Sequence, residues 1–401
     1  MIEAPSEHRR SSLLEIFRAF LLLGVTSFGG PIAHLGYFRN EFVARRRWLS
    51  EAEYADLVAL CQFLPGPASS QVGFALGLMR GGYIGALLAW IAFTFPSVIL
   101  LLLFASMTSF LDGPLAAGAI HGLKLAAVAV VAHAVWGMAR NLCPDNERTG
   151  IALAALVAAI ALPGSWGQVM AIGIGALLGM SLCREAQVAT TTPMATAVSP
   201  RAGVLSLAVM VLLLIGLPLL AWVSGSQFVA LTDAFYRAGA LVFGGGHVVL
   251  PLLEAEVVER GWMSASTFLE GYAAAQAVPG PLFTFAAYLG ALVVPAPNGV
   301  MGALIAVVSI FLPGMLLLIG ILPFWTKVKT LPGAKAAIAG MNAGVVGLLG
   351  AALYDPVWTS AIGSGLDFAL AAIAFFLLVR WQLAAWKIVL ALTVAGIATA
   401  I

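Results

Sequence analysis

A Pro-Gly-Pro tripeptide occurs twice in the chain, each time inside an apolar stretch that would otherwise continue as one helix. The copies lie in residues 62–67 (QFLPGP) and 276–281 (QAVPGP). Proline lacks a backbone N–H and its ring clashes with the preceding turn, so the helix must break at both places. Inside a lipid bilayer, a broken backbone persists only where protein or a water-filled cavity satisfies its polar groups. Both copies therefore predict re-entrant half-helices around a binding site.

The composition explains why a bilayer is the expected surrounding. Of the 401 residues, 61% are hydrophobic and 9% are charged, whereas soluble domains carry about 25% charged residues. We therefore expect an all-α polytopic membrane protein. The three cysteines follow no CxxC or Cys/His spacing and suggest neither a disulfide framework nor a metal site.

Landmarks of the first half return in the second half in the same order. They are FGGP (28–31) and FGGG (243–246), WLS (48–50) and WMS (262–264), the two PGP tripeptides, Pro96 and Pro313, and Gly122 and Gly340. This order indicates an internal duplication. Residues 184–201, with TTTP and SP, have the composition of a linker. We divide the chain into a first repeat (1–183), the linker (184–201), a connecting transmembrane helix (202–226) and a second repeat (227–401).

Charge predicts that the two repeats have opposite orientations in the membrane. Segments between landmarks carry Arg39, Arg45, Arg46, Arg47 and Arg80 in the first half, and Glu254, Glu256 and Glu259 with only Arg260 in the second. Positive loops face the cytoplasm, so the repeats are expected to be inverted, with half-helices meeting near the midplane and about nine full spans. The amino terminus lacks a signal-peptide cleavage site. Its Arg9 and Arg10 predict a cytoplasmic start.

The breaks predict an anion site. The helices that follow Gly30, Pro67, Gly246 and Pro281 begin at a break, so their first N–H groups lack intrahelical partners and carry partial positive charge. Converging helix N-termini of this kind bind oxyanions. The predicted substrate-binding residues are Gly29, Gly30, Gln62, Pro65, Gly66, Pro67, Ser69, Ser70 and Gln71 in the first half, and Gly244, Gly245, Gly246, Gln276, Pro279, Gly280, Pro281 and Thr284 in the second.

Ionisable and polar groups inside apolar spans extend this set. Lys124 is isolated in its span, and its counterpart in the second repeat is Asn342. A lysine buried in lipid is costly, so Lys124 is expected to face the bundle interior or to reach an interface by snorkelling. His247 follows Gly246 and is a candidate anion donor or proton carrier. His34, His121 and His133 are weaker candidates, and Glu41 and Glu256 are equivalent residues for which a solvated role is the alternative.

The paired FGG and PGP motifs, the aligned WxS and the duplicated chain resemble the chromate ion transporter (CHR) family of bacterial inner-membrane proteins. The resemblance covers nearly the whole chain and implies chromate efflux and chromate resistance, with sulfate as the related oxyanion. The family's motif residues fall on Gly29, Gly30, Pro65, Gly66, Pro67, Gly244, Gly245, Pro279, Gly280 and Pro281. Gly246 stands where the first half has Pro31, so the two half-sites are chemically unequal.

The residues alone predict a secondary transporter for a small oxyanion, and the resemblance supplies chromate. No GxxxxGK[ST] motif occurs, and we expect coupling to protons, no cofactor, no metal and no nucleic acid. The alternatives are an uptake carrier for sulfate, an anion channel, and a membrane enzyme such as a chromate reductase. The sequence leaves the coupling ion open, and likewise the choice between a monomer and a homodimer.

Overall fold

The computed structural model describes residues 11–108, 113–162, 165–183, 198–243, 245–328 and 331–399. Within these ranges every regular element is a helix, which confirms the all-α prediction. The first-half helices are α1 (Leu13–Thr26), α2 (Gly30–Phe38) with a π-helical continuation (Arg39–Arg45), α3 (Glu51–Phe63), α4 (Ala68–Thr108), α5 (Pro114–Leu142), α6 (Asn146–Ala161) and α7 (Ser165–Leu182).

Local sequence signals explain where these helices begin and bend. Ser50 and Glu53 form a capping box at the start of α3, because each side chain accepts a hydrogen bond from the other residue's N–H. α4 bends at Gly81 and Gly82, whose backbone angles leave the helical region. The predicted short helix after the first break is therefore joined to the span that follows it.

The second half follows the same order of elements. It begins after α8 (Pro200–Ser224) and contains α9 (Gln227–Ala240), a 3-10 turn (Gly246–Val248), α10 (Val249–Val257), α11 (Ala265–Ala277), a 3-10 turn (Leu282–Thr284), α12 (Phe285–Leu292), α13 (Gly299–Ile321), α14 (Trp325–Val328), α15 (Pro332–Ala352), α16 (Thr359–Ala361), α17 (Gly365–Val379) and α18 (Ala385–Thr399). α8 already begins at Pro200, so the last residues of the predicted linker belong to a helix. Residues 184–197 of that linker lie outside the described residues.

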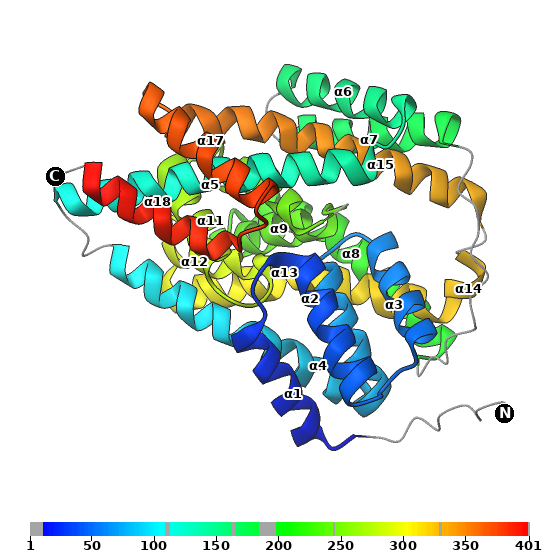
Figure 1. Ribbon diagram of the computed structural model, residues 1–401. Coiled ribbons are helices and arrows are strands. Elements are labelled where there is room, and N and C mark those ends of the chain that lie inside the picture. Colours follow the sequence, from blue (N-terminus) through cyan, green and yellow to red (C-terminus); the bar gives the residue numbers. More distant parts are fainter. Residues whose placement is uncertain are drawn as a thin grey trace.

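The two halves exchange their last helices. α17 and α18 of the second half pack on α5 of the first, whereas α6 and α7 of the first half pack on α15 of the second (Figure 1). The landmark glycines lie at these contacts: a Cβ on Gly122 would be 2.1 Å from the Leu392 carbonyl oxygen, and one on Gly340 would be 2.0 Å from that of Gly175. Glycine lets the helix backbones approach this closely. The halves are therefore continuous in sequence but interlocked in space.

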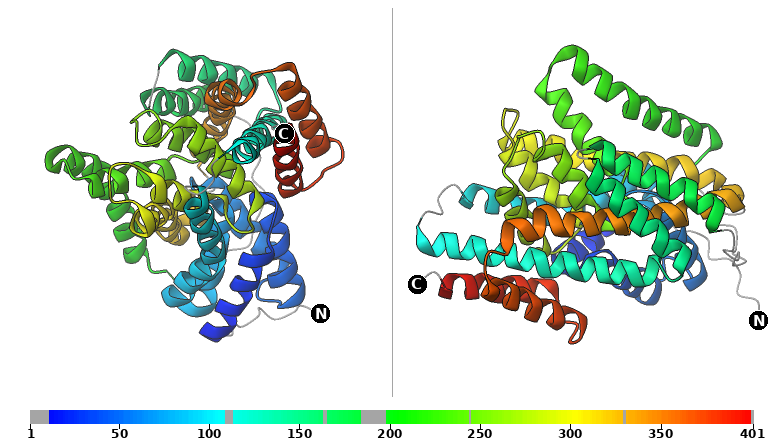
Figure 2. Two further views of the ribbon diagram at one scale, coloured as in Figure 1. Left: turned by 90° about the vertical axis from the view of Figure 1, so that its left-hand side faces the viewer. Right: turned by 90° about the horizontal axis from the view of Figure 1, so that it is seen from above.

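Five helical segments of the described residues are long and apolar enough to cross a membrane. They include α8, which lies on the outside of the molecule (Figure 2) and exposes 84% of Trp222 and 74% of Val223. About nine full spans would require four further helices, α6, α7, α17 and α18. They are helices of 15 to 18 residues, whereas a span needs about 20. The chain is a polytopic membrane protein, and its described residues contain five full-length spans where the sequence predicts about nine.

Candidate functional site

Each of the two Pro-Gly-Pro breaks makes a backbone hydrogen bond to the opposite half of the chain. The Gly66 N–H donates to the Val242 carbonyl oxygen over 2.7 Å, and the Gly280 N–H donates to the Ser27 carbonyl oxygen over 2.9 Å. Ser27 and Val242 are equivalent residues, each directly before an FGG motif. Each break therefore binds the FGG segment of the other half, which explains how a backbone broken inside apolar sequence is satisfied. We call this arrangement the crossing.

Close packing at the crossing brings equivalent positions of the two halves into contact. A Cβ on Gly246 would lie 3.1 Å from Cγ of Pro31, its counterpart in the first half. The different residues at this position thus face each other. Gly66 lies against Gly314, because a Cβ on Gly66 would be 3.2 Å from the Gly314 Cα, and a Cβ on Gly280 would be 2.8 Å from Ser97 Oγ.

The first-half candidates take different roles. Ser69 and Ser70 are buried in the first turn of α4, and the hydroxyl of Ser69 is 3.3 Å from His34 Nδ1. Gln71 donates both amide hydrogens, to the carbonyl oxygens of Pro65 and Gly314, each over 3.0 Å. Its donors are therefore used within the protein. Gln62 is exposed.

Glycine conformation supports the FGG turn of the first half. Gly29 and Gly30 have φ angles of 101° and 77°, which residues with a Cβ rarely adopt. Gly29 is exposed, Gly30 is half-buried, and Pro67 is buried beside the crossing. The turn therefore reaches from the protein surface to the half-buried start of α2.

The second-half candidates are more fully engaged in internal contacts. Thr284 is buried and its hydroxyl donates to the Pro281 carbonyl oxygen over 2.7 Å. His247 Nδ1 is 2.9 Å from the hydroxyl of Tyr272, and the Gln276 amide nitrogen is buried without a hydrogen-bond partner among the described residues. Pro279 is buried, Gly245 has a φ of 146°, and Gly244 lies outside the described residues.

Lys124 has an ionic neighbour that sequence reasoning missed. It is half-buried on α5, and its charge acts on the carboxylate of Glu270 on α11. Glu270 is buried and accepts a hydrogen bond from Ser266 Oγ over 2.8 Å. Its equivalent, Asp56, is also buried, and both carboxylates stand nine residues before a Pro-Gly-Pro, a repeat that the sequence displays. The Oδ1 of Asn342, the counterpart of Lys124, has no hydrogen-bond partner among the described residues.

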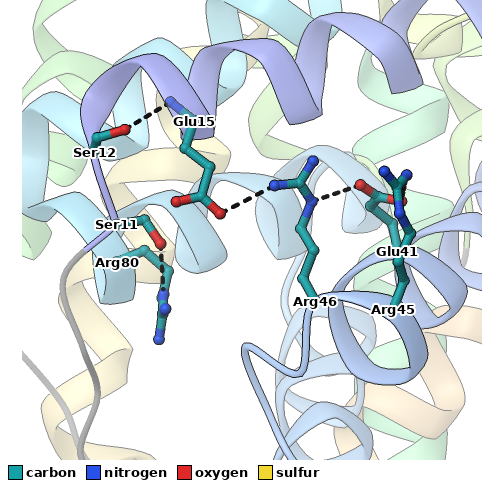
Figure 3. Close-up of polar contacts among 7 residues, drawn as sticks. All are labelled: Ser11, Ser12, Glu15, Glu41, Arg45, Arg46 and Arg80. Carbon is teal, nitrogen blue, oxygen red and sulfur yellow. Dashed lines mark hydrogen bonds and ion pairs between the residues drawn. The ribbon is translucent and has the colours of Figure 1, made fainter.

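Glu41 and Glu256 are buried in ion pairs, so the solvated role proposed as their alternative is wrong. In the first half, Arg46 binds Glu41 over 2.6 Å and Glu15 over 3.0 Å, and Arg45 binds Glu41 over 2.9 Å (Figure 3).

The second half repeats the pair with equivalent residues. Arg260 binds Glu256 over 2.6 Å, and Arg237 approaches the same carboxylate at 3.4 Å. Arg46 lies over Trp48, and Arg260 lies over Trp262. Each half therefore has a glutamate, an arginine and a tryptophan in one cluster at the WxS landmark.

Known proteins resemble the chain over most of its length. The chromate transporter family model matches residues 14–180 and 229–398. A chromate transport protein of Pseudomonas aeruginosa is 29% identical over 96% of this chain and 91% of its own length. A probable chromate transport protein of Synechococcus elongatus is 28% identical, covering 89% of each chain. A chromate transport protein of Cupriavidus metallidurans is 26% identical over 84% of this chain and 81% of its own.

No solved structure matches the chain significantly. The family match covers both halves and most of the residues that build the crossing, including both Pro-Gly-Pro breaks and both FGG segments. The resemblance that the paired motifs suggest is thereby confirmed. The chain belongs to the chromate transporter family.

Proposed function

We propose that the protein is a secondary transporter that exports chromate across the bacterial inner membrane and so confers chromate resistance. The observation that carries the proposal is the crossing, where two broken segments from opposite halves meet in a chain with membrane-spanning helices. Transporters place their substrates at such junctions of discontinuous helices. Relatives named chromate transport proteins support chromate as the substrate, and their names support transport over catalysis.

Flux measurements in proteoliposomes test the proposal. We expect chromate flux that saturates with concentration, changes when a pH gradient is imposed and is inhibited by sulfate, because oxyanions of similar shape and charge are poorly separated by backbone donors. Expression in a chromate-sensitive bacterium should restore growth on chromate. Flux without saturation would identify a channel instead, and sulfate accumulation without chromate efflux would identify a sulfate uptake carrier.

The inverted orientation of the repeats has its own test. Ala44 lies within the arginine-rich segment of the first half, Glu259 lies in the glutamate-rich segment of the second, and both are exposed. In a chain whose native cysteines are replaced by alanine, we expect Ala44→Cys to react with an impermeant maleimide from the cytoplasm and Glu259→Cys to react from the periplasm. Labelling of both positions from one side would contradict the inverted arrangement.

Proton coupling requires a buried group that exchanges a proton, and Glu270 is our candidate. Lys124 on α5 and Tyr288 on α12 are ionisable groups in its neighbourhood. Glu270→Gln is expected to retain chromate exchange at equal pH but to lose the response of flux to a pH gradient. Lys124→Met should weaken chromate affinity while leaving the amount of protein in the membrane near normal, and Lys124→Arg should retain part of the affinity, because the positive charge of Lys124 attracts the dianion.

The exposed glutamate Glu147 on α6 provides a matched control. Glu147→Gln should leave both exchange and the pH response unchanged. If Glu270→Gln responds to a pH gradient as the unmodified protein does, Glu270 does not carry the coupled proton.

A further inference from the structure

The two sides of the crossing are chemically unequal. On the side of the Gly280–Ser27 bond, which we call the first-half side, five equivalent positions carry Ser27, His34, Ser69, Thr94 and Ser97. On the side of the Gly66–Val242 bond, the same positions carry Val242, Val249, Phe283, Phe311 and Gly314. Hydroxyl and imidazole groups therefore gather on one side only of these paired positions.

The polar residues of the first-half side form two hydrogen-bonded groups that both contact Gly280. His34 Nε2 is 3.2 Å from the Ser27 carbonyl oxygen, and His34 Nδ1 is 3.3 Å from Ser69 Oγ. His34 thereby joins the end of α1 to the first turn of α4. Ser97 donates to the Thr94 carbonyl oxygen over 2.9 Å, and a Cβ on Gly280 would meet Ser97 Oγ. The break from the second half therefore lies against the hydroxyls of α4.

Three hydroxyls of this region are buried without a partner. Ser27 is 0% exposed, and Ser70 and Thr94 are each 3% exposed. Their hydroxyl oxygens make no hydrogen bond with the described residues. A buried polar atom left without a partner is unfavourable and is rare in proteins. Ser70 adjoins Ser69, which contacts His34, and Ser97 binds the Thr94 carbonyl oxygen beside Gly280, whose N–H donates to Ser27. Three such hydroxyls around one break point to a polar ligand that accepts hydrogen bonds.

The opposite side is occupied by its own residues. Gln71 fills the position between Pro65 and Gly314 with both amide hydrogens engaged. Thr284, the counterpart of Ser70, donates back to the Pro281 carbonyl oxygen. The chain after the second break begins with a 3-10 turn, whereas the first break leads directly into α4. Among these equivalent positions of the described residues, the hydroxyls left available to a ligand are therefore on the first-half side.

We propose that one tetrahedral dianion, such as chromate or sulfate, binds on the first-half side of the crossing, held by the hydroxyls of Ser27, Ser70 and Thr94. The free N–H groups in the first turn of α4 add donors and the positive end of a helix dipole. The inference rests on the proposed transport function and adds the position and the specificity-determining residues of the site. It predicts a single off-centre site in place of two symmetric half-sites.

Binding of radiolabelled chromate and sulfate to the purified full-length protein tests the site. Ser27→Ala, Ser70→Ala and Thr94→Val are each expected to weaken binding about tenfold, because each removes a hydrogen bond to a charged ligand. Thr94→Ser restores the hydroxyl and should restore binding. Ser309→Ala removes a hydroxyl that is equally buried, on α13, and should bind like the unmodified protein.

Flux in proteoliposomes separates a lost ligand contact from a folding defect. A lost contact raises the half-saturating concentration, whereas a folding defect lowers the amount of protein recovered in the membrane. The off-centre site alone would be overturned if the three variants bound chromate as well as the unmodified protein does. A structure with bound chromate that placed the chromium beside Gln71 and Val242 would have the same consequence. If the unmodified protein binds neither chromate nor sulfate, both the site and the proposed function are wrong.

Discussion

Gly66→Val and Gly280→Val are each expected to abolish transport. Both glycines have positive φ angles, 120° and 99°, which a β-branched residue cannot adopt without strain. A Cβ would also collide with the opposite half, at Gly314 for Gly66 and at Ser97 for Gly280. The substitution therefore separates the break from the FGG segment that it binds. Chromate flux per unit of protein in the membrane is the measurement.

A glycine on α8 supplies the control for this prediction. Gly216 has a helical φ angle and no heavy atom within 4 Å of a Cβ, so Gly216→Val should transport normally. Transport by either variant at the crossing at more than a small fraction of the normal rate would show that the cross-half hydrogen bonds are dispensable.

Glu256→Gln should lower stability by about 3 kcal/mol, because removing one partner of a buried ion pair leaves the other charge uncompensated. We take the low end of the usual range because Arg237 and Arg260 are 24% and 32% exposed. Arg237 also retains its ion pair with Asp233. Thermal unfolding in detergent should show a lower midpoint for Glu256→Gln and, by equivalence, for Glu41→Gln.

Glu147→Gln again serves as the control, since exposed surface substitutions usually change stability by less than about 0.5 kcal/mol. If Glu41→Gln and Glu256→Gln melt at the same temperature as this control, the paired clusters contribute little to folding. A loss in the second half alone would show that Glu15, which binds Arg46 and has no acidic equivalent in the second half, compensates Arg46 when Glu41 is neutralised.

Local chemistry allowed the sequence by itself to determine the helical membrane class and the breaks, and the same local chemistry sets where helices begin and end. Proline ends a helix through its own ring, and Ser50 caps α3 through atoms three residues away. The sequence also indicates the duplication, because equivalent landmarks such as Gly122 and Gly340 recur in the same order. The buried carboxylates Asp56 and Glu270 also stand at equivalent positions, nine residues before each Pro-Gly-Pro, but they are not part of the predicted site.

Only the tertiary structure decided which distant segments meet. Gly66 bonds to Val242, Gly280 bonds to Ser27, and the last helices of each half pack on the other half. An apolar pattern shows that a face is buried but does not name its partner, since any apolar surface is an acceptable neighbour. The same limit applies to polar groups. Gln71 and Thr284 have the donors that an anion site needs. Only the folded chain uses those donors internally, while the hydroxyls of Ser27 and Thr94 have no partner in the part of the chain that the structure describes.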